Sequence, residues 1–143
     1  MKRYRRILVP VDGSELSDLG FERALGFARM VNGKVTIVNV IQDIVGPAGP
    51  ASVPVQIDQT KIAKDLVGNY LHKVEKSDIE VNSEIRHGNP ADEIVELSRD
   101  HDIIIMGSKG HNPITSLLLG SVAEKVVREA CCPVMIIRKR EDE

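Results

Sequence analysis

The chain has 143 residues, of which 42% are hydrophobic and 28% are charged, and its formal net charge is −2. This size and composition predict one globular domain over residues 1–143 and exclude a disordered chain. The slightly acidic charge argues against nucleic acid as the main partner, because binding to that polyanion needs a clustered excess of Lys and Arg.

The start of the chain shows no export signal. Its basic residues are followed by only three apolar residues, Ile7–Val9, before Pro10. No apolar run elsewhere approaches the length of a membrane-spanning helix. We therefore expect a cytoplasmic protein with no membrane partner.

Apolar, β-branched runs alternate along the chain with segments of helical period. This alternation is typical of a parallel sheet with helices on its faces. The runs at residues 7–9, 35–40 and 103–105 are those expected of strands that are buried on both faces. We predict five strands, at Arg5–Val11, Lys34–Val40, Ile79–Arg86, Asp102–Met106 and Val134–Arg138.

Helices are predicted between these strands. Apolar residues recur at three- and four-residue steps over residues 16–31 and again over residues 63–74, so each segment has one apolar face. A shorter helix is predicted to begin with Asn89 as its cap and Pro90 at its first position. The last helix includes residues 121–130, and Ser121 with Glu124 has the spacing of a capping box.

Two other segments invite interpretation. The connection from Ile41 to Pro54 is rich in glycine and proline and has neither period, so we hypothesise that it contributes to the mouth of a site. Cys131 and Cys132 are adjacent and therefore form neither a disulfide framework nor a spaced metal site. We interpret both cysteines as buried small apolar residues.

A glycine-punctuated loop from Gly107 to Ser121 joins the fourth predicted strand to the last predicted helix. Glycines let backbone N–H groups approach an anion, and the following helix N-terminus adds unpaired donors and a positive dipole end. The loop is therefore a candidate phosphate-binding segment. Its spacing matches neither the Walker loop nor the dinucleotide fingerprint, and the same glycines would also suit a tight strand-to-helix turn.

Asp12 ends the first predicted strand. Ligands of open parallel sheets bind outside the carboxyl ends of the strands, where the strand order reverses. There the Asp12 carboxylate could accept hydrogen bonds from a ribose hydroxyl or an adenine amino group. Alternatively, Asp12 caps the helix that starts near Ser14, with Glu15 completing a capping box. The two roles are compatible.

The glycine loop resembles the motif of the ATP-binding universal stress proteins. In this chain the motif is Gly107-x-x-Gly110, nine further residues and then Gly120-Ser121. The opening residues 7–14 and the closing residues 132–138 are also similar to that family. The similarity extends over essentially the whole chain, although between about residues 41 and 81 it is limited to the general pattern.

The resemblance implies a Rossmann-like, doubly wound α/β fold, with five parallel strands in the order 3-2-1-4-5 and helices on both faces. It also implies a homodimer paired through Val134–Arg138 and a bound ATP, with Mg or Mn as a possible companion ion. The implied ligand-binding residues are Pro10, Val11 and Asp12 for adenine and ribose, Val38 or Val40 with Met106 for the base pocket, and Val122 to close it. For the phosphates they are Gly107, Gly110, Gly120 and Ser121, with Ser108 of the same turn as a further donor.

Catalysis is not indicated by the sequence. Lys109 and His111 could each reach a terminal phosphate, but we expect both to face solvent. No carboxylate cluster predicts a metal cage, and no convincing base stands beside an attacking water. We predict a nucleotide-dependent regulatory or stress-response dimer with an unidentified protein partner and at most slow ATP hydrolysis. The alternatives are a dimeric interaction module that binds no nucleotide and a nucleotide hydrolase with His111 or Asp12 as base.

Overall fold

The computed structural model describes residues 3–42, 59–109 and 119–139. None of the helices in these ranges is both long and apolar enough to cross a membrane. Most of the connection expected from Ile41 to Pro54 lies outside the described residues.

The elements, in chain order, are β1 (Arg6–Pro10), α1 (Glu15–Val31), β2 (Lys34–Ile41), α2 (Gln59–Lys73), β3 (Val81–His87), α3 (Pro90–Leu97), the 3₁₀ turn η2 (Ser98–Asp100), β4 (Ile103–Gly107), α4 (Ser121–Glu129) and β5 (Val134–Ile137).

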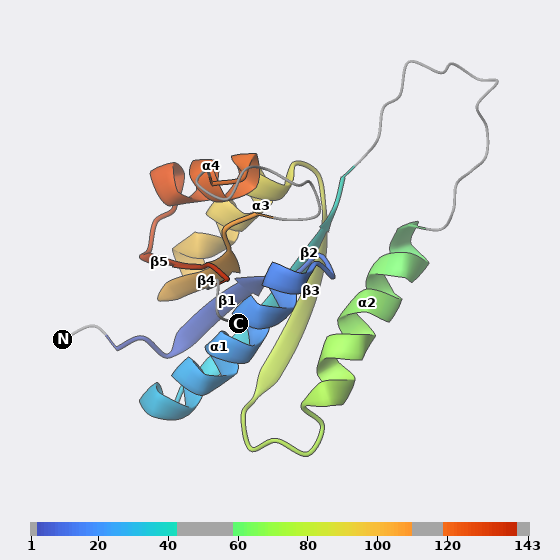
Figure 1. Cartoon of the computed structure of the whole chain (residues 1–143), viewed down its shortest axis with the longest axis vertical. Coiled ribbons are helices and arrows are strands. Elements are labelled where there is room, and N and C mark those ends of the chain that lie inside the picture. The colour runs from blue at the N-terminus through green and yellow to red at the C-terminus, as the bar shows by residue number, and fades with distance from the viewer. Residues whose placement is uncertain (1–2, 43–58, 110–118, 140–143) are drawn as a thin grey trace.

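The strands form one parallel sheet in the order β3-β2-β1-β4-β5 (Figure 1). All five predicted strands are present, with ends that differ by at most two residues from the prediction. β1 pairs with β2 at five positions and with β4 at two, Ile7 with Ile103 and Leu8 with Ile104. The order of strands reverses at β1, so a ligand crevice is expected at the carboxyl ends of β1 and β4.

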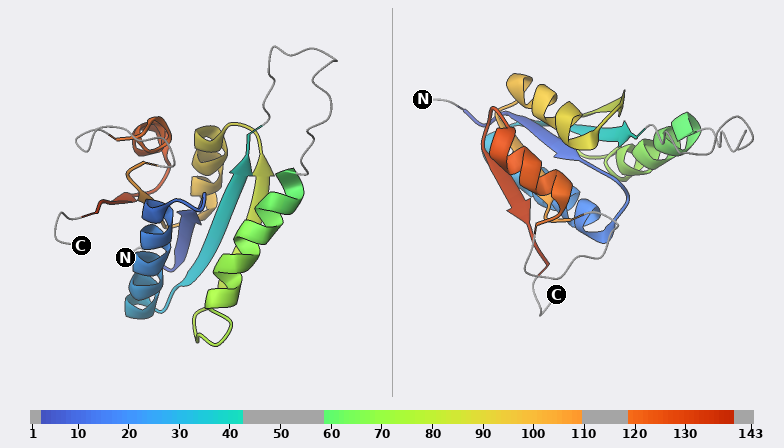
Figure 2. Two further views of the ribbon diagram at one scale, coloured as in Figure 1. Left: turned by 45° about the vertical axis from the view of Figure 1, so that its right-hand side comes forward. Right: turned by 90° about the horizontal axis from the view of Figure 1, so that it is seen from above.

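Helices cover both faces of the sheet. Figure 2 shows α1 and α2 on one side and α3 and α4 on the other. Successive side chains of a strand point to opposite faces. In β1, Ile7 and Val9 accordingly join one core with Phe21 of α1, whereas Leu8 joins a second core with Ile94 of α3. The predicted doubly wound α/β fold is thus confirmed.

The two helices on the second face are held together by polar contacts as well as by this core. Asn89 caps α3 by accepting a hydrogen bond from the Asp92 N–H at 3.1 Å, and Pro90 is the first residue of the helix, as predicted. Lys125 Nζ of α4 lies 2.5 Å from Asp92 Oδ1. The first turn of α3 is therefore fixed against α4.

The two cysteines differ in environment. Cys132 is buried in the core that α3 and α4 share, as expected. Cys131 is exposed, so the prediction that both are buried is wrong for this residue. Its N–H donates to Ser98 Oγ at 2.9 Å, which anchors the turn between α4 and β5 through the main chain and leaves the side chain outside the core.

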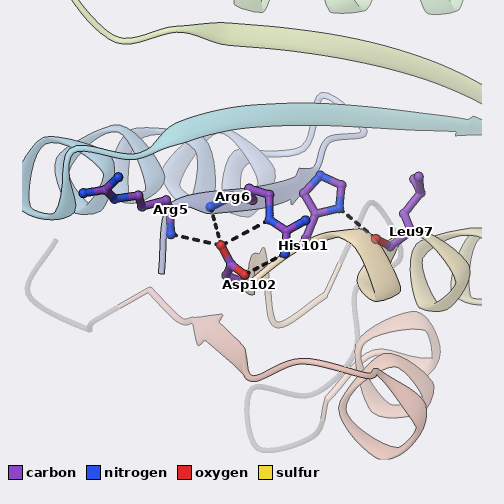
Figure 3. A network of polar contacts seen from close by, with 5 residues as sticks. All are labelled: Arg5, Arg6, Leu97, His101 and Asp102. Atoms are coloured by element: carbon purple, nitrogen blue, oxygen red, sulfur yellow. Dashed lines mark hydrogen bonds and ion pairs between the residues drawn. The ribbon is translucent and has the colours of Figure 1, made fainter. Parts of the chain in front are cut away.

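At the amino ends of β1 and β4, Asp102 holds the two strands together (Figure 3). Its carboxylate accepts hydrogen bonds from the N–H groups of Arg5 and Arg6, at 3.1 and 2.8 Å, and from the Arg6 guanidinium, at 3.1 Å. The Arg6 side chain is the main cause that lowers the pKa of Asp102 below its usual range. This buried carboxylate lies at the opposite end of the strands from the crevice, so we interpret it as structural.

Candidate functional site

A cavity of about 340 Å³ opens at the carboxyl ends of β1, β2 and β4. Its volume is within the range of small-molecule sites, which are mostly apolar with a few polar groups. Ten of the twelve predicted site residues line it: Pro10, Val11, Asp12, Val38, Val40, Met106, Gly107, Gly120, Ser121 and Val122. The fold therefore brings together residues that are far apart in the sequence.

The two remaining predicted residues do not line the cavity in the described structure. Gly110 lies outside the described residues, as does His111. Ser108 is buried, its N–H donates to the Ile137 carbonyl at 3.0 Å, and its own carbonyl accepts from the Gly120 N–H at 2.7 Å. The structure thus uses the Ser108 backbone to join the end of β4 to β5 and to the start of α4.

Several cavity residues are not among the predicted site residues. Lys109 lines the cavity and is half-buried, although it was expected to face solvent. Asn39 interrupts the apolar run of β2, and a polar residue at that place in a buried strand could have indicated a cavity residue. The other residues gave no comparable signal, because their place depends on how separate elements pack: Ser14, Ser17, Gln42, Pro90, Ile94 and Ala123.

The turn between β1 and α1 is held by side chains. Gly13 adopts a φ of +83°, and the Ser14 N–H donates to Asp12 Oδ1 at 2.9 Å. The N-cap of α1 is Ser14, whose side chain accepts from the Ser17 N–H at 3.2 Å. The alternative in which Asp12 itself caps the helix with Glu15 is therefore wrong. Asp12 instead closes the turn before the helix, by accepting the Ser14 N–H.

The end of β1 is also fixed toward β2. The Val11 N–H donates to the Val38 carbonyl at 2.9 Å. The Val11 carbonyl accepts from the side-chain amide of Asn39 at 2.8 Å. Both main-chain groups of Val11 therefore have partners within the protein, which tie this wall of the cavity to β2.

Gly107, at the end of β4, is required by packing. A Cβ atom at this position would lie 2.9 Å from Leu16 Cβ and 3.1 Å from the Leu16 carbonyl oxygen, closer than side chains tolerate. The glycine allows α1 to approach the end of the strand. The position thus has a structural explanation in addition to its place in the cavity wall.

The N-terminus of α4 opens onto the cavity. Its N-cap is Gly120, and no side chain of the described residues caps this end. The predicted capping box is therefore wrong, since Ser121 is the first helical residue. The first N–H groups of a helix have no partner within the helix and carry its positive dipole end. The backbone N–H groups of Ser121, Val122 and Ala123 thus make one end of the cavity suitable for an anion.

Charges of both signs line the cavity. Among the described residues around it, Asp12 and Lys109 are the charged ones. Within residues 3–42, 59–109 and 119–139, no three His, Cys, Asp or Glu side chains lie close enough to hold a metal ion. A metal ion at this site would therefore need ligands from the bound molecule or from other parts of the chain.

Comparisons with known proteins agree with one another. The sequence profile of the universal stress protein family matches residues 3–138. A universal stress protein of Methanocaldococcus jannaschii is 31% identical over 146 residues, which cover 98% of this chain and 85% of that protein.

Solved structures share the fold. The universal stress protein UspA from Lactobacillus plantarum matches with a TM-score of 0.82 at 27% identity, over 96% of this chain and all of that chain. A universal stress protein family protein from Arabidopsis thaliana, solved with AMP bound, matches with a TM-score of 0.70 over 96% of this chain and 94% of that chain. Its identity is 23%, so this likeness concerns the fold.

Proposed function

This chain belongs to the universal stress protein family, and on that premise we propose that it is an ATP-binding regulatory protein. The observation that carries the proposal is the N-terminus of α4, which no described side chain caps and which lines the cavity at the switch point of the sheet. Such an end holds phosphate through backbone N–H groups. The AMP bound by the Arabidopsis thaliana protein, which shares the fold, supports an adenine nucleotide as the ligand.

In this proposal the two ends of the nucleotide meet different parts of the cavity. The phosphates lie at the start of α4, against the N–H groups and the Ser121 hydroxyl, with Gly107 and Gly110 in the same loop. The nucleoside lies at the end of β1, beside the Asp12 carboxylate, whose Oδ1 accepts the Ser14 N–H and whose two oxygens can each accept more than one hydrogen bond. The apolar walls suit the base: Pro10, Val11, Val38, Val40, Met106 and Val122.

An accompanying Mg or Mn ion would be held mainly by the phosphates. This arrangement is in keeping with the lack of a metal-ligating cluster among the described residues. We propose at most slow hydrolysis. Asp12 is the one carboxylate among the described cavity residues, and its Oδ1 already accepts the Ser14 N–H, which favours a binding role over that of a base.

The proposed regulatory unit is a homodimer. β5 is an edge strand of the sheet, and Met135 in its middle is 37% exposed. An unpaired edge is a liability that pairing with a second copy removes. We propose that two copies pair through Val134–Arg138 and that the bound nucleotide determines which protein partner the dimer recruits.

A second candidate is an interaction module of the same fold that binds no nucleotide. The contact between Gly107 and Leu16 favours it, because packing alone accounts for a glycine of the motif. The N-terminus of α4, which no side chain of the described residues caps, favours the nucleotide, because it lines the cavity.

The experiment that separates the two candidates starts from freshly purified protein. The protein is denatured, any released nucleotide is identified, and refolded, stripped protein is titrated with Mg-ATP by calorimetry. We expect a Kd in the micromolar range with one site per chain. Protein that releases no nucleotide and gives no heat at millimolar Mg-ATP would refute ATP binding and leave the interaction module.

A further inference from the structure

A chain of hydrogen bonds connects the cavity with α2. The Asp12 N–H donates to Ser17 Oγ at 3.0 Å, and Ser17 Oγ lies 3.1 Å from the Tyr70 hydroxyl oxygen. The Tyr70 hydroxyl in turn donates to the Asp18 carboxylate. Asp12 belongs to the turn after β1, Ser17 and Asp18 to α1, and Tyr70 to α2. Three segments of the chain therefore meet in one network beside the cavity.

The donors in this network all point the same way. Tyr70 has a single hydroxyl proton, which it gives to Asp18. Ser17 must therefore donate its own proton to the Tyr70 oxygen, while its oxygen accepts from the Asp12 N–H. Hydrogen bonds in such a series polarise one another, and this series ends on a carboxylate, which strengthens the last bond.

The Tyr70 hydroxyl is fixed in place and keeps its proton. The side chain is 2% exposed, and its ring meets the Phe21 ring edge to face, with 5.1 Å between the ring centroids. Burial and the hydrogen bond to Asp18 raise the pKa of Tyr70 to about 12. The phenol is therefore a permanent donor at neutral pH, held at one position by the core between α1 and α2.

We propose that Tyr70 is a positioning residue of the nucleotide site, which acts through Ser17 on the main chain of Asp12. This inference rests on the proposed function and extends it to α2, an element that contributes no residue to the cavity lining described above. In the proposed function the Asp12 turn lies at the nucleoside end of the site, whereas Gly107 at the end of β4 and the first N–H groups of α4 lie at the phosphate end. Loss of the Tyr70 hydroxyl should therefore weaken contacts to the nucleoside and leave phosphate binding intact.

The linkage is reciprocal. If the network stabilises the turn that holds the nucleoside, then a bound nucleoside stabilises the network and the part of α2 around Tyr70 by the same free energy. Inorganic tripolyphosphate carries the phosphates without the nucleoside, so it should leave α2 unchanged. This contrast separates a positioning role from a general contribution to stability.

The test compares Tyr70→Phe with the control Tyr4→Phe. The chain has two tyrosines, and Tyr4 is exposed before β1. Stripped proteins are titrated with Mg-ATP by calorimetry, and tripolyphosphate is measured as a competitor. We expect Tyr70→Phe to weaken ATP binding about fivefold, the equivalent of one ordinary hydrogen bond, with tripolyphosphate affinity unchanged. Tyr4→Phe should match the wild type in both.

Ser17→Ala supplies a second variant. If Tyr70 acts through Ser17, then Ser17→Ala should also weaken ATP selectively, and the double variant should bind ATP no more weakly than the weaker single variant. Fully additive losses would overturn the proposed route. Equal loss of ATP and tripolyphosphate affinity in Tyr70→Phe would show general loosening and would also overturn it.

Hydrogen exchange on the wild-type protein gives a measurement that needs no variant. Saturating Mg-ATP should slow exchange of the Asp12 amide and of α2 amides near Tyr70, and tripolyphosphate should not. Slowed exchange confined to α4 and β4 would overturn the inference, while the proposal that the protein binds ATP would stand. A wild-type protein that does not bind Mg-ATP would overturn the proposed function itself, and the inference with it.

Discussion

Gly107 and Leu16 lie so close together that a Cβ atom on the glycine would be 2.9 Å from the Cβ of the leucine. The contact joins the end of β4 to the first turn of α1, at the point where both border the cavity. It shows that a residue of the glycine motif supports the packing of the fold. The stability and the binding effects of motif substitutions must therefore be measured separately.

Gly107→Ala should lower the free energy of unfolding by about 1–3 kcal/mol, because the added methyl group forces α1 away from β4. Urea denaturation checks this value. Gly26→Ala is the matched control, since this glycine lies within α1 and a Cβ there would meet nothing within 4 Å. That change should raise stability by about 0.5–1 kcal/mol. Equal effects of the two substitutions would contradict the packing argument.

Ser121→Asp should abolish or strongly weaken Mg-ATP binding without harming the fold. An acidic residue in the first turn of α4 suits the helix dipole, but it repels phosphate at the same place. We expect at least about a tenfold rise in Kd by calorimetry. Ser121→Asn has nearly the same shape and no charge, so it should bind far better than the Asp variant. Equal ATP affinities of the two variants would show that the phosphates do not bind at the N-terminus of α4.

Asp102→Asn should lower the free energy of unfolding by about 1–3 kcal/mol at pH 7, because the N–H donors of Arg5 and Arg6 lose a charged acceptor. The pKa of Asp102 is lowered in the folded protein, so its contribution is complete above the ordinary carboxyl pKa of about 4 and is lost as the pH falls through the folded value. The difference between variant and wild type, from urea denaturation, should shrink at acid pH. ATP affinity at pH 7 should stay unchanged, and a changed affinity would contradict a purely structural role.

The Tyr70 phenol should titrate near pH 12 in the folded Tyr4→Phe variant, where it is the single tyrosine. Phenolate absorbance measures the midpoint, which should fall to about 10 in urea. Since the folded pKa is the higher one, the stabilising contribution is complete below about pH 10 and is lost as the pH rises through about 12. A folded midpoint near 10 would show that the hydroxyl is not held as described.

Met135→Lys should raise the dissociation constant of the dimer at least about tenfold, because a charged side chain on an edge strand opposes pairing with another edge. Sedimentation velocity over a concentration series measures the change. Met30→Lys is the control, since Met30 is 82% exposed and belongs to α1, not to the edge strand. A wild-type protein that stays monomeric at high micromolar concentration would exclude the proposed dimer.

The sheet could be predicted because its strands are buried on both faces. Runs such as Ile7–Val9 and Ile103–Ile105 are apolar without alternation, which is typical of central parallel strands. The strand order came from the resemblance to the universal stress proteins, since burial alone does not rank the strands. Cys131 shows the limit of such reasoning, because the neighbour of a buried cysteine in a short turn points outward.

Helix caps were harder to predict than helices. Both Asp12 and Ser14 can cap a helix, and only the structure shows that Asp12 closes the turn while Ser14 is the cap. At α4 the capping-box spacing from Ser121 to Glu124 gave a wrong prediction, because the helix begins at Ser121, one residue earlier than such a box requires. Local sequence gives the residue types of a cap, and the path of the preceding chain selects among them.

Most of the cavity lining could be predicted because it follows the motif and the strand ends. Ser17 and Tyr70 could not, since each is one residue of an otherwise amphipathic helix. Their hydroxyl groups meet only when α1 and α2 pack on the same face of the sheet. Such contacts depend on the register between helices, which periodicity does not specify.

The pairing of β1 with β4 stops at Leu8 and Ile104, while both strands continue toward the cavity. Backbone hydrogen bonds between these two strands therefore do not set the width of the gap beyond that point. Beyond it, residues such as Val11 and Met106 line the cavity. Substitutions of these residues can change which ligand fits the cavity without breaking a backbone hydrogen bond of the sheet. Ligand specificity can therefore change among relatives while the fold stays the same.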